Sequence, residues 1–190
     1  MNPLTADEAY ERLRLGNRRF LDDAPEGTGR DEARRRLLAD SQHPFAVILC
    51  CADGRVVPEI AFDTGIGELF VVRVAGNVAN RSTIASIEYA VANLDTKLVV
   101  VMGHQNCGAV AAAVAGSSAS PNLDYLLEHI RPAIRNSEDA EPDAVAQRNT
   151  QVSAERLVSE SDIIREAVQH DGVRVITAFY HPGTGQIELV

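Results

Sequence analysis

Continuous apolar runs are the strongest pattern of hydrophobic and polar positions along this chain. Each run is short, rich in β-branched residues and bounded by polar or glycine-containing segments. Unbroken runs of this kind are typical of strands buried on both faces of a parallel sheet. The runs cover residues 45–51, 69–74, 98–102 and 173–180. We therefore predict four buried strands, and a final strand over 186–190 after a turn at 182–185.

The segments between these runs read as helices. Thr5 is a candidate N-cap and Glu8, three residues later, completes a capping box for a helix over 5–21. A polar, glycine-containing loop follows before the next helix. The remaining helices are expected at 31–40, 82–93, 107–115, 122–135 and 143–169, the last ended by a glycine.

Strands that alternate with helices predict an α/β fold. We expect a central, mainly parallel β-sheet of four strands plus a C-terminal edge strand, flanked by helices, with an N-terminal helical arm. The chain is expected to form a single domain over 1–190, with the arm at 1–40 and the α/β core at 42–190.

Composition narrows the function classes. The chain has 190 residues, 45% of them hydrophobic and 24% charged, which suits one soluble globular domain. A net charge of -9 argues against nucleic acid or an anionic membrane as the partner. No apolar run is long enough to span a bilayer, and the first residues do not resemble a signal peptide. Three cysteines make no disulfide framework, so we expect a reducing, cytoplasmic location with thiols available for metal.

The candidate chemistry lies where two of the predicted strands end. Cys51 ends the first apolar run, and His104 and Cys107 follow the third. In an open parallel sheet ligands bind at the carboxyl ends of the strands, so these side chains should meet at one edge. Two thiolates and an imidazole form a zinc ligand set with one position left open. The sequence therefore favours a catalytic zinc over a structural one.

The neighbouring cysteine needs a separate assignment. Adjacent side chains on a strand point to opposite faces, so Cys50 and Cys51 should not bind the same ion. Asp53 and Arg55 lie two and four residues after Cys51, so their side chains should point to the same face as that of Cys51. This favours Cys51 as the ligand and Cys50 as a core residue. Taken singly, a buried cysteine or a surface ion pair needs no metal to explain it. Their occurrence together at two strand ends favours the metal site.

These residues resemble the signature of the β-class carbonic anhydrases, which is C-x-D-S-R followed some fifty residues later by H-x-x-C. The similarity continues over 67–77 and 86–91. It implies one Zn²⁺ per subunit, held by Cys51, His104 and Cys107. It also implies reversible hydration of CO2 to bicarbonate and a proton by attack of zinc-bound hydroxide. In this scheme Asp53 accepts a hydrogen bond from the hydroxide and Arg55 holds the Asp53 carboxylate in place.

The resemblance also implies substrate-binding residues and an oligomer. Gln42 matches a substrate contact of the plant-type members, expected to act across a dimer interface. Phe70 and Tyr89 match pocket-lining positions, although ordinary core packing also explains them. The backbone N–H of Gly108 is a further candidate donor to substrate. The expected assembly is a homodimer or a dimer of dimers.

Two positions depart from the family pattern. Gly54 stands where the family usually has serine, and the lost hydroxyl is expected to loosen the loop around Asp53. Ile48 stands where one branch carries the tryptophan of an inhibitory bicarbonate pocket, and the chain has no tryptophan. The plant-like branch, with an accessible zinc, is therefore favoured.

Three other functions remain open. One is a hydrolase of a CO2 analogue, carbonyl sulfide or carbon disulfide, at the same zinc site. Another is a non-catalytic, zinc-bound regulatory module, which a fourth protein ligand would favour. The third is a Rossmann-like nucleotide binder suggested by Gly65-Ile66-Gly67, but this segment lacks the G-x-G-x-x-G spacing.

Overall fold

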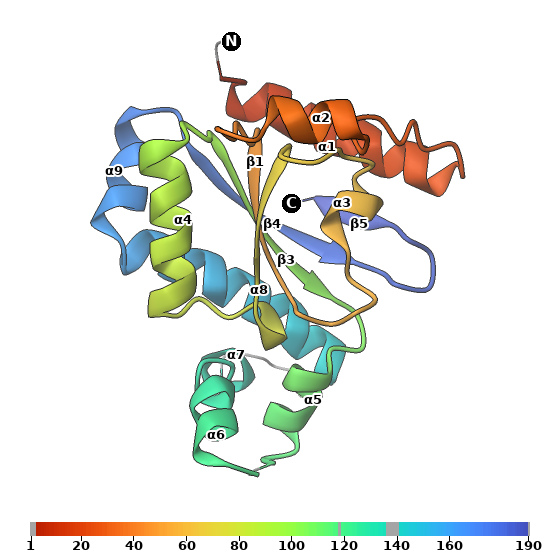
Figure 1. Ribbon diagram of the computed structural model, residues 1–190. Coiled ribbons are helices and arrows are strands. Elements are labelled where there is room, and N and C mark those ends of the chain that lie inside the picture. Colours follow the sequence, from red (N-terminus) through yellow and green to blue (C-terminus); the bar gives the residue numbers. More distant parts are fainter. Residues whose placement is uncertain (1–2, 118, 136–140, 190) are drawn as a thin grey trace.

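A five-stranded sheet organises the computed structural model, which describes residues 3–117, 119–135 and 141–189. The strand order is β2-β1-β3-β4-β5 (Figure 1). The first four strands are parallel, and β5 pairs antiparallel with β4. The strands are β1 Ala46–Cys50, β2 Leu69–Arg73, β3 Leu98–His104, β4 Arg174–Tyr180 and β5 Ile187–Leu189. The predicted mainly parallel sheet with a C-terminal edge strand is confirmed. The prediction of four buried strands is wrong for β2, which lies at the other edge of the sheet and is only half-buried.

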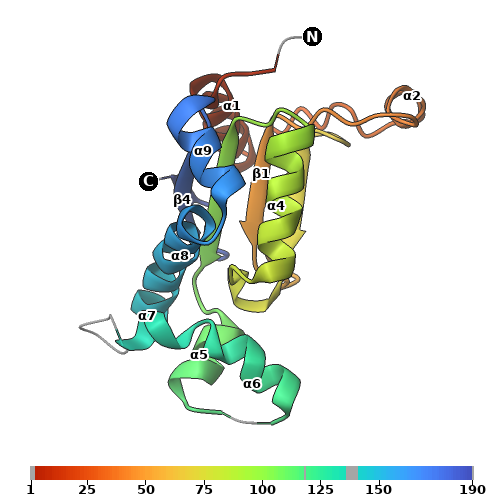
Figure 2. The ribbon, with the colours of Figure 1, turned by 90° about the vertical axis from the view of Figure 1, so that its left-hand side faces the viewer.

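Helices cover both faces of the sheet (Figures 1 and 2). One face packs against α1 Ala6–Leu21 and α3 Pro58–Ala61. The other packs against α4 Arg81–Asn93, α8 Pro142–Ser159 and α9 Asp162–His170. The carboxyl end of the sheet is capped by α5 Gly108–Val114, α6 Pro121–Glu128 and α7 Arg131–Arg135. Every residue of β1 and β3 is buried, which explains the unbroken apolar sequences of 46–50 and 98–102.

The N-terminal helix begins with the predicted capping box between Thr5 and Glu8. The loop that follows α1 is held by Asp63, whose side chain has no exposed surface. Its carboxylate accepts from Arg19 Nε at 2.6 Å and from the Glu26 and Gly27 N–H groups at 2.9 and 3.1 Å. The second helix of the arm, α2 Glu32–Leu37, has no buried residue and stands away from the body of the molecule (Figure 2).

Several predicted helix boundaries are wrong. The segment expected as one helix over 122–135 is divided into α6 and α7, because Pro132 offers no N–H and disfavours helix before it. The helix expected over 143–169 is divided into α8 and α9, where Ser161 caps the second helix by accepting from the Ile164 N–H. The second arm helix is shorter than the predicted 31–40, and β3 extends beyond the predicted 102 to His104. Two short helices were missed, α3 and the 3₁₀ turn η1 Ala75–Asn77.

Among the described residues, no helix combines the length and the apolar character needed to cross a bilayer.

Candidate metal centre

Two neighbouring parallel strands bring the three candidate ligands together. β1 and β3 pair directly, with Cys50 opposite Met102. Cys51 follows β1, His104 is the last residue of β3, and Cys107 is the N-cap of α5. Their ligand atoms all lie within 4.8 Å of one another, and all three residues are buried. The residues that the sequence predicted at one sheet edge therefore form one cluster.

The tautomer of His104 suits a metal ligand. Its Nδ1 lies 2.9 Å from the carbonyl oxygen of Gln105, so Nδ1 carries the proton and donates it. The other nitrogen, Nε2, is buried and has no hydrogen-bond partner among the described residues. Histidines that bind metals commonly donate one ring N–H to a carbonyl in this way, which fixes the ring and leaves the lone pair of the other nitrogen for the ion.

Backbone amides favour a thiolate at Cys51. The N–H groups of Gly76 and Asp53 point at its Sγ from 3.3 and 3.4 Å. A hydrogen bond from the Cys107 thiol lowers the pKa of Cys51 most, and the Cys51 thiolate in turn raises the pKa of Cys107. Two thiolates this close repel each other, so both can be ionised only with a cation between them. A divalent ion that prefers sulfur and imidazole, such as Zn²⁺, fits this donor set.

Cys50 belongs to the core, as its parity predicts. It is fully buried in the cluster on the α1 face of the sheet, whereas Cys51 and Cys107 pack at the carboxyl end. Burial raises the pKa of the Cys50 thiol to about 12, so this sulfur stays protonated.

Asp53 and Arg55 form the expected bidentate pair. Arg55 Nε lies 3.0 Å from Asp53 Oδ1 and Arg55 Nη2 lies 2.7 Å from Oδ2. The Arg55 backbone N–H also donates to Oδ1 at 2.9 Å. These hydrogen bonds hold the pKa of the Asp53 carboxyl well below its usual range. Arg55 Nη2 also donates to the Asn106 carbonyl at 3.1 Å, so it links the two loops that carry the candidate ligands.

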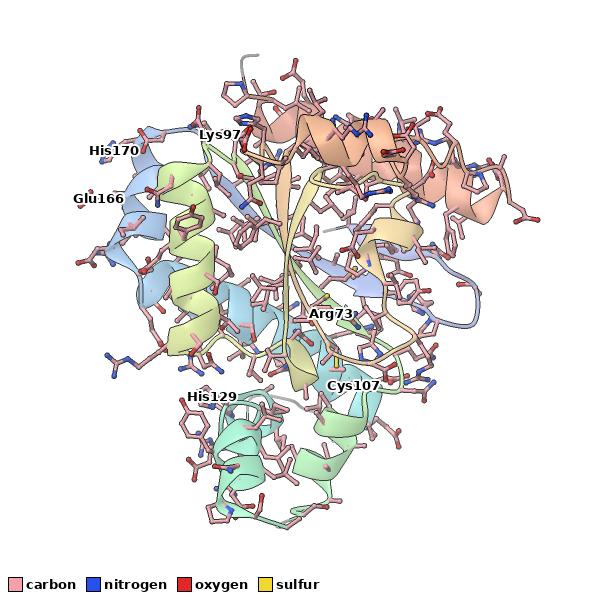
Figure 3. The ribbon with its side chains drawn as sticks, in the orientation of Figure 1. Arg73, Lys97, Cys107, His129, Glu166 and His170 are labelled. Carbon is pink, nitrogen blue, oxygen red and sulfur yellow. The ribbon has the colours of Figure 1, made fainter. Side chains whose placement is uncertain are left out.

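Two further residues hold these loops and were missed from the sequence. Arg73, at the end of β2, donates to the Cys51 carbonyl at 3.1 Å and to the Asp53 carbonyl at 2.7 Å. Asp143, in the first turn of α8, accepts from the Asn106 N–H at 2.7 Å. Figure 3 shows Arg73 and Cys107 at the same end of the sheet. A charged residue at a strand end was the only sequence signal for Arg73.

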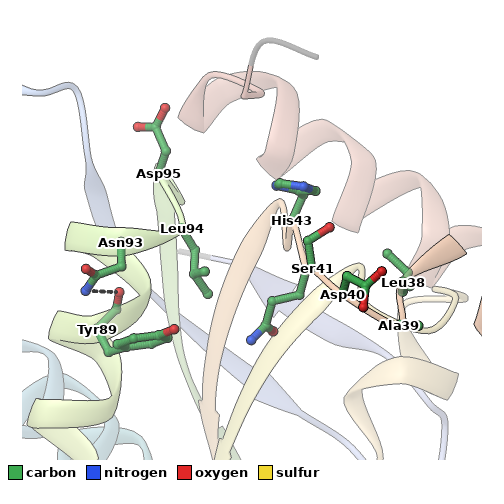
Figure 4. Close-up of a pocket in the computed structure, with 10 residues that line it drawn as sticks. Leu38, Ala39, Asp40, Ser41, His43, Tyr89, Asn93, Leu94 and Asp95 are labelled. Carbon is green, nitrogen blue, oxygen red and sulfur yellow. Dashed lines mark hydrogen bonds between the residues drawn. The ribbon is translucent and has the colours of Figure 1, made fainter.

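Three of the predicted substrate-binding residues lie far from the cluster of candidate ligands. Gln42 and Tyr89 line an open depression of about 710 Å³, shown in Figure 4, and the Phe70 ring lies 6.4 Å from that of Tyr89. Gln42 precedes β1, whereas Cys51 follows it. The five residues of the intervening strand β1 separate them by about 17 Å, at about 3.3 Å per residue. Gly108, in contrast, directly follows Cys107 at the start of α5. Within one chain, therefore, Gly108 lies beside the cluster of candidate ligands. The other three predicted substrate-binding residues lie near the opposite end of the sheet.

The glycines flanking His104 and Cys107 differ in their surroundings. A Cβ on Gly103 would lie 2.1 Å from Thr150 Oγ1, so this position requires glycine for close packing of α8 on β3. A Cβ on Gly108 would meet nothing within 4 Å, so close packing does not require glycine at this position. Gly54 also has open space around it and no left-handed backbone.

Comparisons with known proteins agree with this geometry. A family model described as carbonic anhydrase matches residues 46–187. Carbonic anhydrase 2 of Mycobacterium tuberculosis is 35% identical over 195 residues, covering 99% of this chain and 93% of the relative. A carbonic anhydrase of Mycolicibacterium smegmatis is 33% identical over the same shares.

Solved structures show the same fold. A β-carbonic anhydrase of Coccomyxa in complex with acetazolamide has a TM-score of 0.73 and 26% identity, covering 94% of this chain and 84% of the other. A tetrameric β-carbonic anhydrase of Sordaria macrospora has a TM-score of 0.76 and 24% identity, covering 96% and 97%. The family model, the relatives that match over nearly the whole chain and the shared fold all lead to the same conclusion. The chain is an enzyme that belongs to the β-carbonic anhydrase family.

Proposed function

We propose that the protein catalyses reversible hydration of CO2 to bicarbonate and a proton at one Zn²⁺ per chain, held by Cys51, His104 and Cys107. The observation that carries this proposal is the buried Cys-His-Cys cluster beside an ionised, arginine-held aspartate. Zn²⁺ bound at such a site lowers the pKa of water toward about 7 and so supplies the nucleophile.

Asp53 orients the attacking water. Its carboxylate is ionised, so it acts as a hydrogen-bond acceptor and directs an oxygen lone pair toward the carbon of CO2. Arg55 donates a hydrogen bond to each oxygen of the Asp53 carboxylate, which keeps the carboxylate from turning toward the metal site. Within the described residues the group of ligand atoms that lie within 4.8 Å of one another comprises Cys51, His104 and Cys107, and Asp53 lies outside it. The Gly108 N–H, beside Cys107, is the donor that we propose for the substrate oxygen.

A second subunit would complete the site. Gln42, Phe70 and Tyr89 lie near the amino end of the sheet, away from their own chain's cluster. We propose a homodimer, alone or paired as a dimer of dimers, in which these residues line the partner's metal site. The arm formed by α1 and α2 is the segment that we propose to embrace the partner, since α2 buries nothing in its own chain.

The reaction is tested by stopped-flow CO2 hydration, with metal analysis, on the wild type and on Asp53→Ala. We expect zinc in both proteins and hydration only in the wild type. Full hydration by Asp53→Ala would overturn the role of that residue. Zinc without CO2 hydration, but with turnover of carbonyl sulfide or carbon disulfide, would move the substrate to a CO2 analogue. The regulatory-module alternative needs a fourth protein ligand, and the described residues bring three ligand atoms together.

A further inference from the structure

A buried amide on α8 reaches one of the two metal-binding loops. Asn149 is fully buried on the face of α8 that packs against the sheet and η1. Its Nδ2 donates to the carbonyl of Gly76 at 2.7 Å. That carbonyl can only accept, so the contact fixes which end of the amide faces Gly76.

Gly76 in turn contacts a proposed ligand. Its N–H donates to Cys51 Sγ at 3.3 Å. The residue has φ 72° and ψ 17°, a left-handed conformation that glycine adopts without strain. A Cβ there would lie 2.8 Å from Ile130 Cδ1 and 3.3 Å from the Ala109 Cβ. Gly76 is therefore held on one side by packing, on another by Asn149, and presents its N–H to the sulfur.

Stability alone does not account for this amide. Asn149 Oδ1 is buried and has no hydrogen-bond partner among the described residues. Burying a half-satisfied amide costs free energy that an apolar side chain would avoid. An asparagine at this position is better explained by what its Nδ2 holds.

We propose that Asn149 is a positioning residue for the metal centre, which fixes Gly76 so that its N–H stays directed at Cys51 Sγ. The inference rests on the zinc site proposed above. An N–H directed at the sulfur withdraws charge from the thiolate and sets the direction of its remaining lone pairs.

The same helix also holds the second loop. Asp143, six residues before Asn149, accepts from the Asn106 N–H at 2.7 Å. Asn106 has a left-handed φ of 56°, and its carbonyl accepts from Arg55. One rigid helix thus fixes Gly76 behind Cys51 and Asn106 beside Cys107. This common support fixes the separation of the two sulfurs.

The test compares zinc affinity and metal spectroscopy in three variants. Asn149→Ala removes the donor. Asn149→Asp keeps the size of the side chain and places an acceptor against the Gly76 carbonyl. This second variant keeps the test valid if the alanine of Asn149→Ala unfolds the helix. Ser153→Ala is the matched control, because Ser153 is buried one turn further along α8. Zinc affinity is measured by competition with a chelator, and the thiolate-to-metal charge-transfer band is recorded on the Co²⁺-substituted proteins. Circular dichroism of the zinc-free proteins confirms folding.

We expect both Asn149 variants to bind Zn²⁺ about 10–100-fold more weakly than the wild type, the range found when a residue that supports a metal ligand is lost. Their charge-transfer band should move to lower energy, because a thiolate without its N–H donor is more electron-rich. Ser153→Ala should change neither. Wild-type affinity and spectrum in the folded Asn149 variants would overturn the inference, as would the same losses in Ser153→Ala. A wild type that binds no zinc would instead overturn the metal centre itself.

Discussion

Replacing Gly103 by alanine is expected to destabilise the protein through one specific contact. Gly103 lies in β3 beside His104, where α8 packs directly on the strand. The new Cβ would lie 2.1 Å from Thr150 Oγ1, 3.3 Å from Phe179 Cδ2 and 3.4 Å from the Ala146 carbonyl oxygen. The first distance is far below van der Waals contact. The Thr150 hydroxyl cannot turn away freely, because it is buried and donates to the Ala146 carbonyl at 2.9 Å.

The size of the effect follows from this overlap. Forcing an extra carbon into a packed core costs about 1–3 kcal/mol. At about 2–4 °C per kcal/mol for a chain of this length, the melting temperature should fall by about 2–12 °C. Because the overlap is with a single oxygen, Thr150→Ala in the Gly103→Ala background should recover part of the loss, with a coupling of about 0.5–3 kcal/mol.

The assay is thermal and urea unfolding of the zinc-free proteins, so that metal binding does not alter the apparent stability. The set comprises the wild type, both single variants and the double variant. Gly183→Ala is the control, because a Cβ at Gly183 would meet nothing within 4 Å. A Gly103→Ala protein as stable as the wild type would refute the reasoning. Strictly additive effects of Gly103→Ala and Thr150→Ala would show that the overlap with Thr150 is not the cause.

Three further predictions concern single positions. Cys51→Ala should lose zinc in metal analysis, whereas Cys50→Ala should retain it because Cys50 lies in the core. Zinc retained by Cys51→Ala would contradict the ligand assignment. Gly54→Ala should raise the free energy of unfolding by about 0.4–1 kcal/mol in urea titrations, because the site has room for a side chain; a loss of stability would contradict this. Burial opposes ionisation of Asp63, but hydrogen bonds from Arg19 and the Glu26 and Gly27 N–H groups lower its pKa below the ordinary value. Its contribution to stability is therefore complete above about pH 4 and is lost as the pH falls. Urea midpoints measured from about pH 2 to 5 should depend less on pH in Asp63→Asn than in the wild type; an equal dependence would show that Asp63 does not contribute.

The sheet and the ligand cluster were predictable because local patterns encode them. A strand buried on both faces is mostly apolar, and β1 and β3 are buried at every position. The alternation of side chains separates Cys50 from Cys51 without further information. The parallel pairing of β1 with β3 then brings their carboxyl ends to the same edge of the sheet. The cluster of Cys51, His104 and Cys107 follows from these rules.

The helix boundaries failed although local signals were present. Pro132 lies inside the segment expected as one helix, and a proline there removes a backbone donor. Ser161 is a good N-cap residue in the middle of the other, and its hydroxyl also donates to Glu88 on α4. The apolar spacing across both breaks concealed these signals.

Other parts of the site could not be found from local sequence. Arg73, Asp143 and Asn149 act on backbone groups that are distant in sequence, and only the folded chain brings them together. Gln42 and Tyr89 were singled out by family resemblance alone. A site shared between two subunits, as we propose here, leaves no pattern within either chain.

Zinc titration of the metal-free protein, with stopped-flow CO2 hydration as the readout, tests the central claim most directly. The hydration rate should rise in proportion to zinc and stop rising at one ion per chain. At that point activity should increase as the pH rises above about 7, because two thiolates offset the charge of the ion and make its water harder to ionise. Zinc bound at one ion per chain with no CO2 hydration between about pH 6 and 9 would contradict the account.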